Sequence, residues 1–194
     1  MSVAVGDVNG DGHPDLAVAN VLSDTVSVLL GHGDGTFANK VDYPTGHNPN
    51  SVVVGDFTGD GHLDLVTANY GANTVSVLLG RGDGTFAGNV DYPTGINTAS
   101  VAVGDFSGDG ELDLVTANDA SNTVSVLLGD GDGTFAPKVD YPTGNSPFSL
   151  AVGDFTGQPG RSRWRRPSGQ GGLGCLFLRR WENCSRVVCQ RSRI

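Results

Sequence analysis

Near its start the chain reads Val5-Gly6-Asp7-Val8-Asn9-Gly10-Asp11-Gly12-His13-Pro14-Asp15-Leu16, and related stretches follow 49 and 98 residues later. The two later copies begin at Val54 and Val103. Residues 51–99 and 100–148 are identical at 36 of 49 positions, so the similarity extends over whole units. Self-similarity at a fixed period of this size is the signature of a repeat architecture. The predicted units are 1–50, 51–99, 100–148 and the start of a fourth at 149–157.

Short apolar runs separated by turn residues fill each unit. In the second unit they are Ser51-Val52-Val53-Val54, Leu63-Asp64-Leu65-Val66-Thr67-Ala68, Thr74-Val75-Ser76-Val77-Leu78-Leu79 and a weaker run from Phe86 to Tyr92. Glycine or proline breaks every window long enough for a helix. Four short strands per unit are typical of a propeller blade. We therefore predict an all-β chain that forms a partial β-propeller of four-stranded antiparallel blades, with three blades and a broken fourth. A β-solenoid is the alternative architecture.

Charge divides the chain into two unlike parts. The formal net charge is −9 over 194 residues, yet residues 1–157 hold 20 acidic residues against three basic ones. Residues 158–194 hold nine arginines and one acid. The acidic part would repel nucleic acid and anionic membranes, so neither is an expected partner. No apolar run reaches the roughly 18 residues that a membrane helix needs. All three cysteines (Cys175, Cys184, Cys189) follow the repeats, which therefore need no disulfide.

Each unit carries an acidic loop between its first and second predicted strands. Oxygen-bearing side chains stand at loop positions 1, 3, 5 and 9, position 6 is glycine, and position 7 offers its backbone carbonyl. This resembles the first part of an EF-hand loop, which surrounds Ca²⁺ with six to eight oxygens. The candidate Ca²⁺ ligands are Asp7, Asn9, Asp11, the carbonyl of His13 and Asp15 in the first loop; Asp56, Thr58, Asp60, the carbonyl of His62 and Asp64 in the second; and Asp105, Ser107, Asp109, the carbonyl of Glu111 and Asp113 in the third.

Two departures from the EF-hand pattern lower the expected affinity. Position 3 is Asn9 in the first loop but a hydroxyl residue in the other two. Position 12, where an EF-hand has a bidentate Glu, holds Val18, Thr67 and Thr116. The Asp at position 9 must then close the site, and we expect a dissociation constant of roughly 10⁻⁴–10⁻³ M. The alternative is that these aspartates only cap turns. Three copies in register favour calcium, and we expect chelation to loosen the loops.

Two segments carry a resemblance to a known family. They are the run from Val5 to Leu16, the turn Leu29-Leu30-Gly31-His32-Gly33-Asp34-Gly35-Thr36-Phe37, and their copies 49 and 98 residues on. They resemble the FG-GAP/VCBS repeat family, related to the blades of integrin alpha-subunit propellers, and the resemblance covers residues 1–157. It implies a seven-bladed propeller with calcium between the first two strands of a blade. It also implies adhesion, carbohydrate binding or scaffolding at an extracellular or cell-surface location.

Three other features have simpler interpretations. Arg81-Gly82-Asp83 matches an adhesive triplet that some integrins recognise, but only Gly-Asp recurs at this place in the other units, so a hairpin turn explains it. The four histidines do not cluster at zinc-ligand spacing, and we expect His13 and His62 to face solvent. Tyr43 recurs 49 and 98 residues later. We expect these rings to pack between blades; stacking on a sugar is the alternative.

No catalytic site is predicted. A carboxylate pair could drive glycoside hydrolysis, but here the carboxylates recur in every unit, whereas a catalytic site is normally built once. The sequence also shows no nucleophile elbow, phosphate-binding loop or Cys/His pair. We therefore expect a protein that is not an enzyme.

The repeat pattern stops at residue 158. Gln158 and Ser162 stand where a fourth loop needs aspartates. A shift of reading frame explains the change, because Arg179-Arg180-Trp181-Glu182-Asn183 can be encoded so that the next frame reads Gly-Asp-Gly-Lys-Thr, close to where such a turn is due. The alternative is a basic tail that binds nucleic acid. We predict that residues 158–194 are an aberrant and poorly ordered basic tail.

The N-terminus lacks a signal peptide, and Met1 leads directly into a repeat. We therefore expect a fragment of a longer protein. Closed propellers need about four to eight blades, so an open arc would expose apolar blade faces and favour self-association. The expected function is a calcium-binding module of a secreted or surface protein that binds a protein or carbohydrate ligand. The alternatives are a lectin-like propeller and a non-catalytic accessory domain of a larger secreted enzyme.

Overall fold

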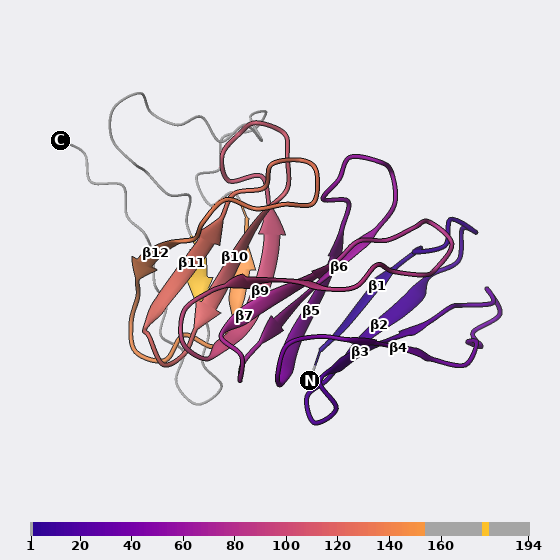
Figure 1. Ribbon diagram of the computed structural model, residues 1–194, viewed down its shortest axis with the longest axis horizontal. Helices are drawn as coiled ribbons and strands as arrows, with labels where there is room; N and C mark the ends of the chain where they lie inside the picture. The colour runs from indigo at the N-terminus through magenta and orange to yellow at the C-terminus, as the bar shows by residue number, and fades with distance from the viewer. Residues whose placement is uncertain (1, 154–175, 179–194) are drawn as a thin grey trace.

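The computed structural model describes residues 2–153 and, for the backbone alone, 176–178. Strands, turns and bends account for the regular structure of these residues, which include no helix (Figure 1). The described part of the chain accordingly contains no helix able to span a membrane. The prediction of an aberrant, poorly ordered tail at 158–194 concerns residues that, apart from one short strand, lie outside the described ranges.

Three consecutive four-stranded sheets contain most of the strands. The first sheet contains β1 (Val3–Gly6), β2 (Asp15–Asn20), β3 (Thr25–Leu29) and β4 (Val41–Pro44). The second contains β5 (Pro49–Gly55), β6 (Asp64–Asn69), β7 (Thr74–Leu78) and β8 (Val90–Pro93). The third contains β9 (Thr98–Gly104), β10 (Asp113–Asn118), β11 (Thr123–Leu127) and β12 (Val139–Pro142). A two-stranded sheet of β13 (Leu150–Val152) and β14 (Leu176–Leu178) follows.

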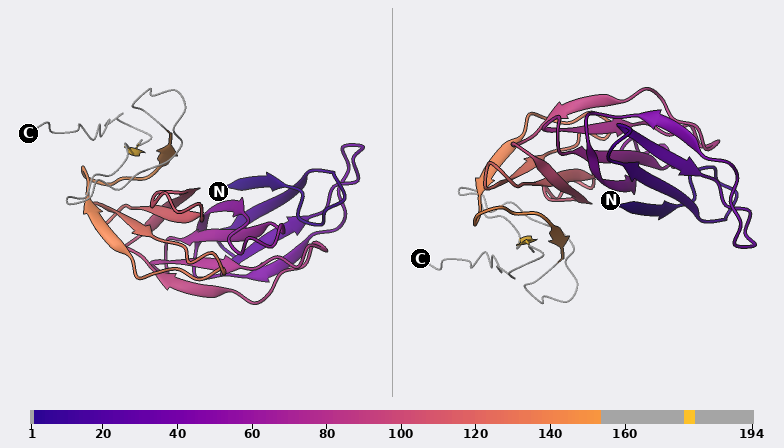
Figure 2. Two further views of the ribbon diagram at one scale, coloured as in Figure 1. Left: turned by 90° about the horizontal axis from the view of Figure 1, so that it is seen from above. Right: turned by 90° about the horizontal axis from the view of Figure 1, so that it is seen from below.

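Each large sheet is an antiparallel meander in which sequential strands are neighbours. The register repeats with the sequence: Val5 pairs with Leu16, and Val54 pairs with Leu65. The sheets follow one another along an open arc, which Figure 2 shows from above and from below. The prediction of an all-β partial propeller with four-stranded antiparallel blades is therefore confirmed, and the three sheets are called blades from here on.

Several strand boundaries in the second blade differ from the sequence-based expectation, and two differ by more than one residue. The fourth strand of the second blade begins at Val90 rather than at Phe86, because Phe86 forms an isolated bridge with Gly80 that closes a tight turn. β5 begins at Pro49, two residues before the predicted second unit, and its register shifts between Pro49 and Ser51. The strand therefore includes the end of the linker from the first blade.

The apolar core lies between the blades. The first blade contributes small and β-branched side chains to the first junction, and the second blade contributes larger ones. The members of this cluster are Val8, Ala17, Ala19, Val26 and Val28 from the first blade and Val52, Leu65, Leu78 and Phe86 from the second. The second junction repeats the arrangement with Phe57, Val66, Ala68, Val75 and Val77 against Val101, Leu114, Leu127 and Phe135. Each buried Val, Leu or Phe side chain stabilises the fold by about 1.5–3 kcal/mol.

Burial along the strands shows the effect of this stacking. Every residue of β6 is buried, because the second blade is covered on both faces. In β2 buried and half-buried residues alternate, which is the pattern of a strand covered on one face. Val3 is 58% exposed, whereas its counterpart Val52 is 3% exposed. The first blade therefore presents one uncovered apolar face.

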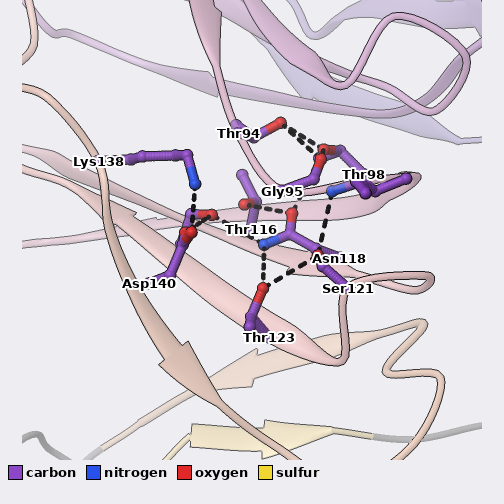
Figure 3. Close-up of polar contacts among 11 residues, drawn as sticks. Thr94, Gly95, Thr98, Thr116, Asn118, Ser121, Thr123, Lys138 and Asp140 are labelled. Carbon is purple, nitrogen blue, oxygen red and sulfur yellow. Dashed lines mark hydrogen bonds and ion pairs between the residues drawn. The ribbon is translucent and has the colours of Figure 1, made fainter.

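A buried polar network lies on the third blade beside the linker from the second (Figure 3). The side chain of Asn118 donates to Thr123 and Ser125 and accepts a hydrogen bond from Thr116. Ser125 then donates to Asp140 at 2.6 Å. Since a buried polar group without a partner costs about 1–3 kcal/mol, these bonds allow polar residues inside a strongly packed sheet. The second blade repeats the network around Asn69, where Ser76 also accepts the amide of Gly46 from the preceding linker.

Candidate metal centre

The candidate metal loops connect the first and second strands of each blade. In the first loop the Asp7 carboxylate accepts the amides of Gly10 at 2.8 Å and Asp11 at 3.2 Å on Oδ1, and the amide of Gly12 at 2.8 Å on Oδ2. Asp56 and Asp105 accept the amides of the equivalent glycines at 2.6–3.2 Å. These bonds curl the backbone around the position-1 carboxylate, so all three loops form the same turn.

Two glycines allow this curl. Gly10 has φ = 73° and Gly12 has φ = 85°, values that residues with a side chain rarely adopt. The equivalent glycines of the other two loops also have positive φ. The Asp-x-(Asn/Thr/Ser)-Gly-Asp-Gly pattern is thus a requirement of the backbone as well as a source of oxygen atoms.

Positions 3 and 5 contact each other in the first loop. Asn9 donates through Nδ2 to Asp11 Oδ2 at 2.9 Å, and the Asp11 amide donates to Asn9 Oδ1 at 3.1 Å. The amide of His13 donates to Asp11 Oδ1 at 2.8 Å and is the main cause of the lowered pKa of Asp11. The lowered pKa of Asp11 favours its charged form, which a calcium ligand must adopt.

The residue at position 3 is a weaker candidate ligand in the second and third loops than in the first. The hydroxyl of Thr58 donates to Asp56 Oδ1 at 3.3 Å, and the hydroxyl of Ser107 accepts the amide of Asp109 at 3.3 Å. Both hydroxyls form hydrogen bonds within their loops but carry no charge. Burial acts to raise the pKa of Asp56, but the amides of Gly61, Gly59 and Thr58 outweigh it and lower that pKa.

Position 7 carries exposed side chains, as predicted for His13 and His62. Each side chain lies over a glycine of its own blade: a Cβ added to Gly33 would come within 2.5 Å of the His13 ring. Glu111 lies over Gly131 in the same way. The carbonyl at position 7 is the group proposed as a ligand, and this remains a prediction.

The aspartate at position 9 has a structural role that the sequence reasoning missed. Asp15 is 1% exposed; its Oδ2 accepts the amide of Val8 at 2.8 Å and its Oδ1 accepts the amide of Gly31 at 2.7 Å. Asp64 and Asp113 are fully buried and make the same bonds to the equivalent amides. A buried carboxylate thus ties the metal loop to the turn after the third strand. The constant 16-residue spacing from this Asp to the glycine that opens the turn was the available signal.

The negative charge of the loop acts on two of these buried carboxylates, Asp64 and Asp113. Burial raises the pKa of Asp64, the amides of Gly80 and Phe57 oppose that shift, and the charges of Asp60 and Asp56 add to it. Burial also raises the pKa of Asp113. The negative charges of Asp56 and Asp60 thus act on Asp64, and a cation placed in the loop would offset this repulsion.

The fit to calcium rests on oxygen chemistry. Over residues 2–153, no group of three or more His, Cys, Asp or Glu side chains gathers as a compact metal site. The remaining candidate donors are backbone carbonyls and the amide or hydroxyl oxygens at position 3, which suit a hard cation. Oxygen donors that include carboxylates, in a loop curled by two glycines, match calcium better than zinc or copper, which prefer nitrogen and sulfur.

The two motifs with simpler interpretations have structural roles. Arg81-Gly82-Asp83 forms a tight turn in which Asp83 accepts the amide and the hydroxyl of Thr85. The ring of Tyr43 meets that of Phe86 in the next blade edge-on, with centroids 5.3 Å apart. The Tyr92 and Phe135 rings repeat this contact at 5.4 Å. Packing between blades is thereby confirmed for these tyrosines.

Solved structures share the fold. A lectin from Agrocybe aegerita that recognises non-reducing terminal N-acetylglucosamine is 26% identical, with a TM-score of 0.50 over 70% of this chain. A protein from Lactobacillus plantarum is 15% identical, with a TM-score of 0.55 over 91% of this chain. BBS1N, solved in complex with ARL6DN, is 15% identical, with a TM-score of 0.53 over 77% of this chain.

This chain spans only part of each of these proteins: 36% of the lectin, 47% of the Lactobacillus protein and 46% of BBS1N. A search of curated proteins gave no match. The FG-GAP-like repeat family matches the chain three times, over residues 7–67, 56–116 and 106–157. These matches contain all three acidic loops and follow the period of the blades. The chain therefore belongs to the FG-GAP-like repeat family.

Proposed function

We propose that this chain is a calcium-binding repeat module of a secreted or cell-surface protein. The observation that carries the proposal is the threefold recurrence of one loop geometry, in which Asp7, Asp56 and Asp105 each accept the amides of two positive-φ glycines. A turn could be capped by one Asp alone. The additional oxygen residues at positions 3 and 5 in every copy are what a calcium loop requires.

In the first loop the proposed ligands are Asp7, Asn9, Asp11, the carbonyl of His13 and Asp15. Asp15 already accepts two amides, and each carboxylate oxygen has a second lone pair that can face an ion. The second and third loops supply the equivalent donors. With a neutral hydroxyl at position 3, those two loops are expected to bind more weakly than the first.

Isothermal titration calorimetry of the full chain tests the proposal. We expect up to three Ca²⁺ ions per chain with dissociation constants near roughly 10⁻⁴–10⁻³ M. Mg²⁺ demands a stricter octahedral geometry and should compete poorly. The absence of any Ca²⁺ uptake at 10 mM would refute the proposal.

The blades would then act as a rigid support that displays loops for binding a protein or a carbohydrate, in adhesion or scaffolding. The acidic character of residues 1–157 supports calcium and disfavours nucleic acid as a partner. The proposed role is not catalytic, because the carboxylates recur in register and the buried ones bind backbone amides. An accessory domain of a larger secreted enzyme fits the same features.

A carbohydrate-binding role is the second candidate. It is supported by the similarity to the Agrocybe aegerita lectin, which is 26% identical over 70% of this chain. Binding of the full chain to glycans that end in N-acetylglucosamine, with galactose-terminated glycans as the control, would test it. Equal signals from both glycan sets, or none from either, would contradict this candidate.

A further inference from the structure

One peptide segment in each of the first two metal loops also belongs to the interface with the next blade. The amide of Val8 donates to buried Asp15, while the carbonyl of Val8 accepts the amide of Gly84 in the second blade at 3.2 Å. In the next junction the carbonyl of Phe57 accepts the amide of Gly133 at 2.9 Å. At loop position 2 the backbone amide therefore bonds within its own blade, whereas the backbone carbonyl bonds to the following blade.

The same turn of the following blade rests on loop position 3, a candidate ligand. A Cβ at Gly84 would lie 3.0 Å from the Leu30 methyl groups and 3.5 Å from the Cβ of Asn9. A Cβ at Gly133 would lie 3.2 Å from Cγ2 of Thr58. Positions 2 and 3 of the loop therefore form the surface on which the next turn docks.

The side chains at position 2 extend this contact. Val8 and Phe57 are 4% and 3% exposed, and both belong to the clusters between blades. The Phe57 ring meets the Phe135 ring of the third blade edge-on, with centroids 5.7 Å apart. Any change in the loop backbone at position 2 is consequently transmitted to a hydrogen bond and to an apolar contact of the neighbouring blade.

We propose that calcium binding in the first and second loops strengthens the docking of the blade that follows each of them, a coupling that rests on the calcium function proposed above. Ligands at positions 1, 3 and 5 would fix the backbone on both sides of position 2, and with it the direction of the carbonyl that the next turn binds. Because coupling between two binding events is reciprocal, the docked turn raises the calcium affinity of the loop by the same factor.

Hydrogen exchange of the full chain measures the first half of this coupling. Calcium, compared with EDTA, should slow exchange of the Gly84 and Gly133 amides by at least about fivefold. Gly35 is the internal control, because it holds the same turn position in the first blade and a Cβ there would have nothing within 4 Å. Its exchange should not change. Equal slowing at Gly35 would indicate general stabilisation and overturn the proposal.

Two matched variants assign the effect to individual loops. Asp11→Asn should abolish the calcium effect at Gly84 and leave Gly133 unchanged, whereas Asp60→Asn should do the reverse. Asparagine keeps an oxygen that can accept the amide of residue 13 or 62, so each loop can keep its turn. A loss of both effects in either variant would contradict loop-by-loop coupling.

A comparison of Gly84→Ala with Gly35→Ala tests the reciprocal effect, in which the docked turn raises the calcium affinity of the loop. Both glycines have positive φ, at 83° and 88°, so both variants carry a similar backbone strain. Only the Cβ of Gly84→Ala would crowd Leu30 and so displace the turn from the first loop. Calorimetry should then show one calcium site weakened by about fivefold or more. If this variant does not fold, the exchange data on the wild-type and Asn variants decide. Calcium uptake without any change at Gly84 and Gly133 would overturn the coupling alone; no uptake would overturn the calcium function as well.

Discussion

The Oδ1 atom of Asp64 accepts the amide hydrogen of Gly80 at 2.8 Å, which ties the first residue of β6 to the turn that follows β7. The other carboxylate oxygen accepts the amide of Phe57 at 2.8 Å. One fully buried side chain therefore joins three segments of the second blade: the metal loop, β6 and the turn after β7.

Replacing this carboxylate should destabilise the blade strongly. Asp64→Ala leaves the buried amide of Phe57 and the partly buried amide of Gly80 without this acceptor. The expected loss in the free energy of unfolding is about 2–4 kcal/mol. Asp64→Asn retains one acceptor and should lose less. Urea unfolding in EDTA measures both, with Asp83→Ala in an exposed turn as the control. A loss no larger than that of Asp83→Ala would contradict the structural role of Asp64.

Calcium should raise the thermal stability of the chain. At a Ca²⁺ concentration ten times the dissociation constant, each occupied loop contributes about 1.4 kcal/mol. Differential scanning calorimetry should therefore show a higher Tm in calcium than in EDTA. The triple variant D11N/D60N/D109N removes one carboxylate from each loop and should lose this difference. A wild-type Tm that is the same in calcium and EDTA would argue against metal binding.

Acid titration should separate the buried from the exposed carboxylates. In EDTA, burial should raise the titration midpoint of Asp64 above 3.8, whereas hydrogen bonds from Thr85 should lower that of Asp83 below it. A folded-state pKa above the unfolded value means that Asp64 contributes most stability below its unfolded pKa. That contribution is lost as pH rises through the raised folded pKa. Carboxyl ¹³C NMR measures both midpoints, and a lower midpoint for Asp64 than for Asp83 would contradict this assignment.

The aromatic contact between blades offers a test with a built-in control. Phe135 is 7% exposed and meets Phe57 and Tyr92, so Phe135→Ala should cost about 3–5 kcal/mol. Phe37 holds the same position in the first blade but is 40% exposed. Phe37→Ala should therefore cost about 1 kcal/mol or less. Equal losses in urea unfolding would mean that the contact between blades does not account for the cost.

The uncovered face of the first blade should promote self-association. Val3 and Val5 are 58% and 57% exposed on this face. Sedimentation at increasing protein concentration should show growing association, and Val5→Asp should reduce it. Val90, on the outer strand of the second blade, is equally exposed at 55% and serves as the control position. An equal effect of Val90→Asp would exclude a specific role of the first blade's face.

The repeat period was enough to predict the blades. A 49-residue period with four apolar runs allows few other folds, and the register of Val5 with Leu16 repeats as the sequence does. Packing between blades was predictable for Tyr43 because its position recurs. Strand ends were less predictable: Phe86 reads as part of a strand, yet its isolated bridge to Gly80 places it in a turn.

The candidate site was only partly predictable. The oxygen pattern identified the loops, but the bonds from Asp15 to the amides of Val8 and Gly31 depend on how separate strands are arranged. A residue that looks like a ligand in the sequence can therefore also be a buried acceptor. The contact of Gly84 with the preceding loop could not be predicted from the sequence either, because the residues that Gly84 contacts lie in another unit.

In residues 2–153 the apolar clusters between blades join sequential neighbours, so the cooperativity of unfolding should be one-dimensional. The first blade, with Val3 and Phe37 exposed, has a single stabilising neighbour, whereas the second has two. In such arrays the total stability is close to a sum of repeat terms and nearest-neighbour terms. The first blade should then unfold before the second, and each bound ion would lengthen the stretch of the array that unfolds as a unit.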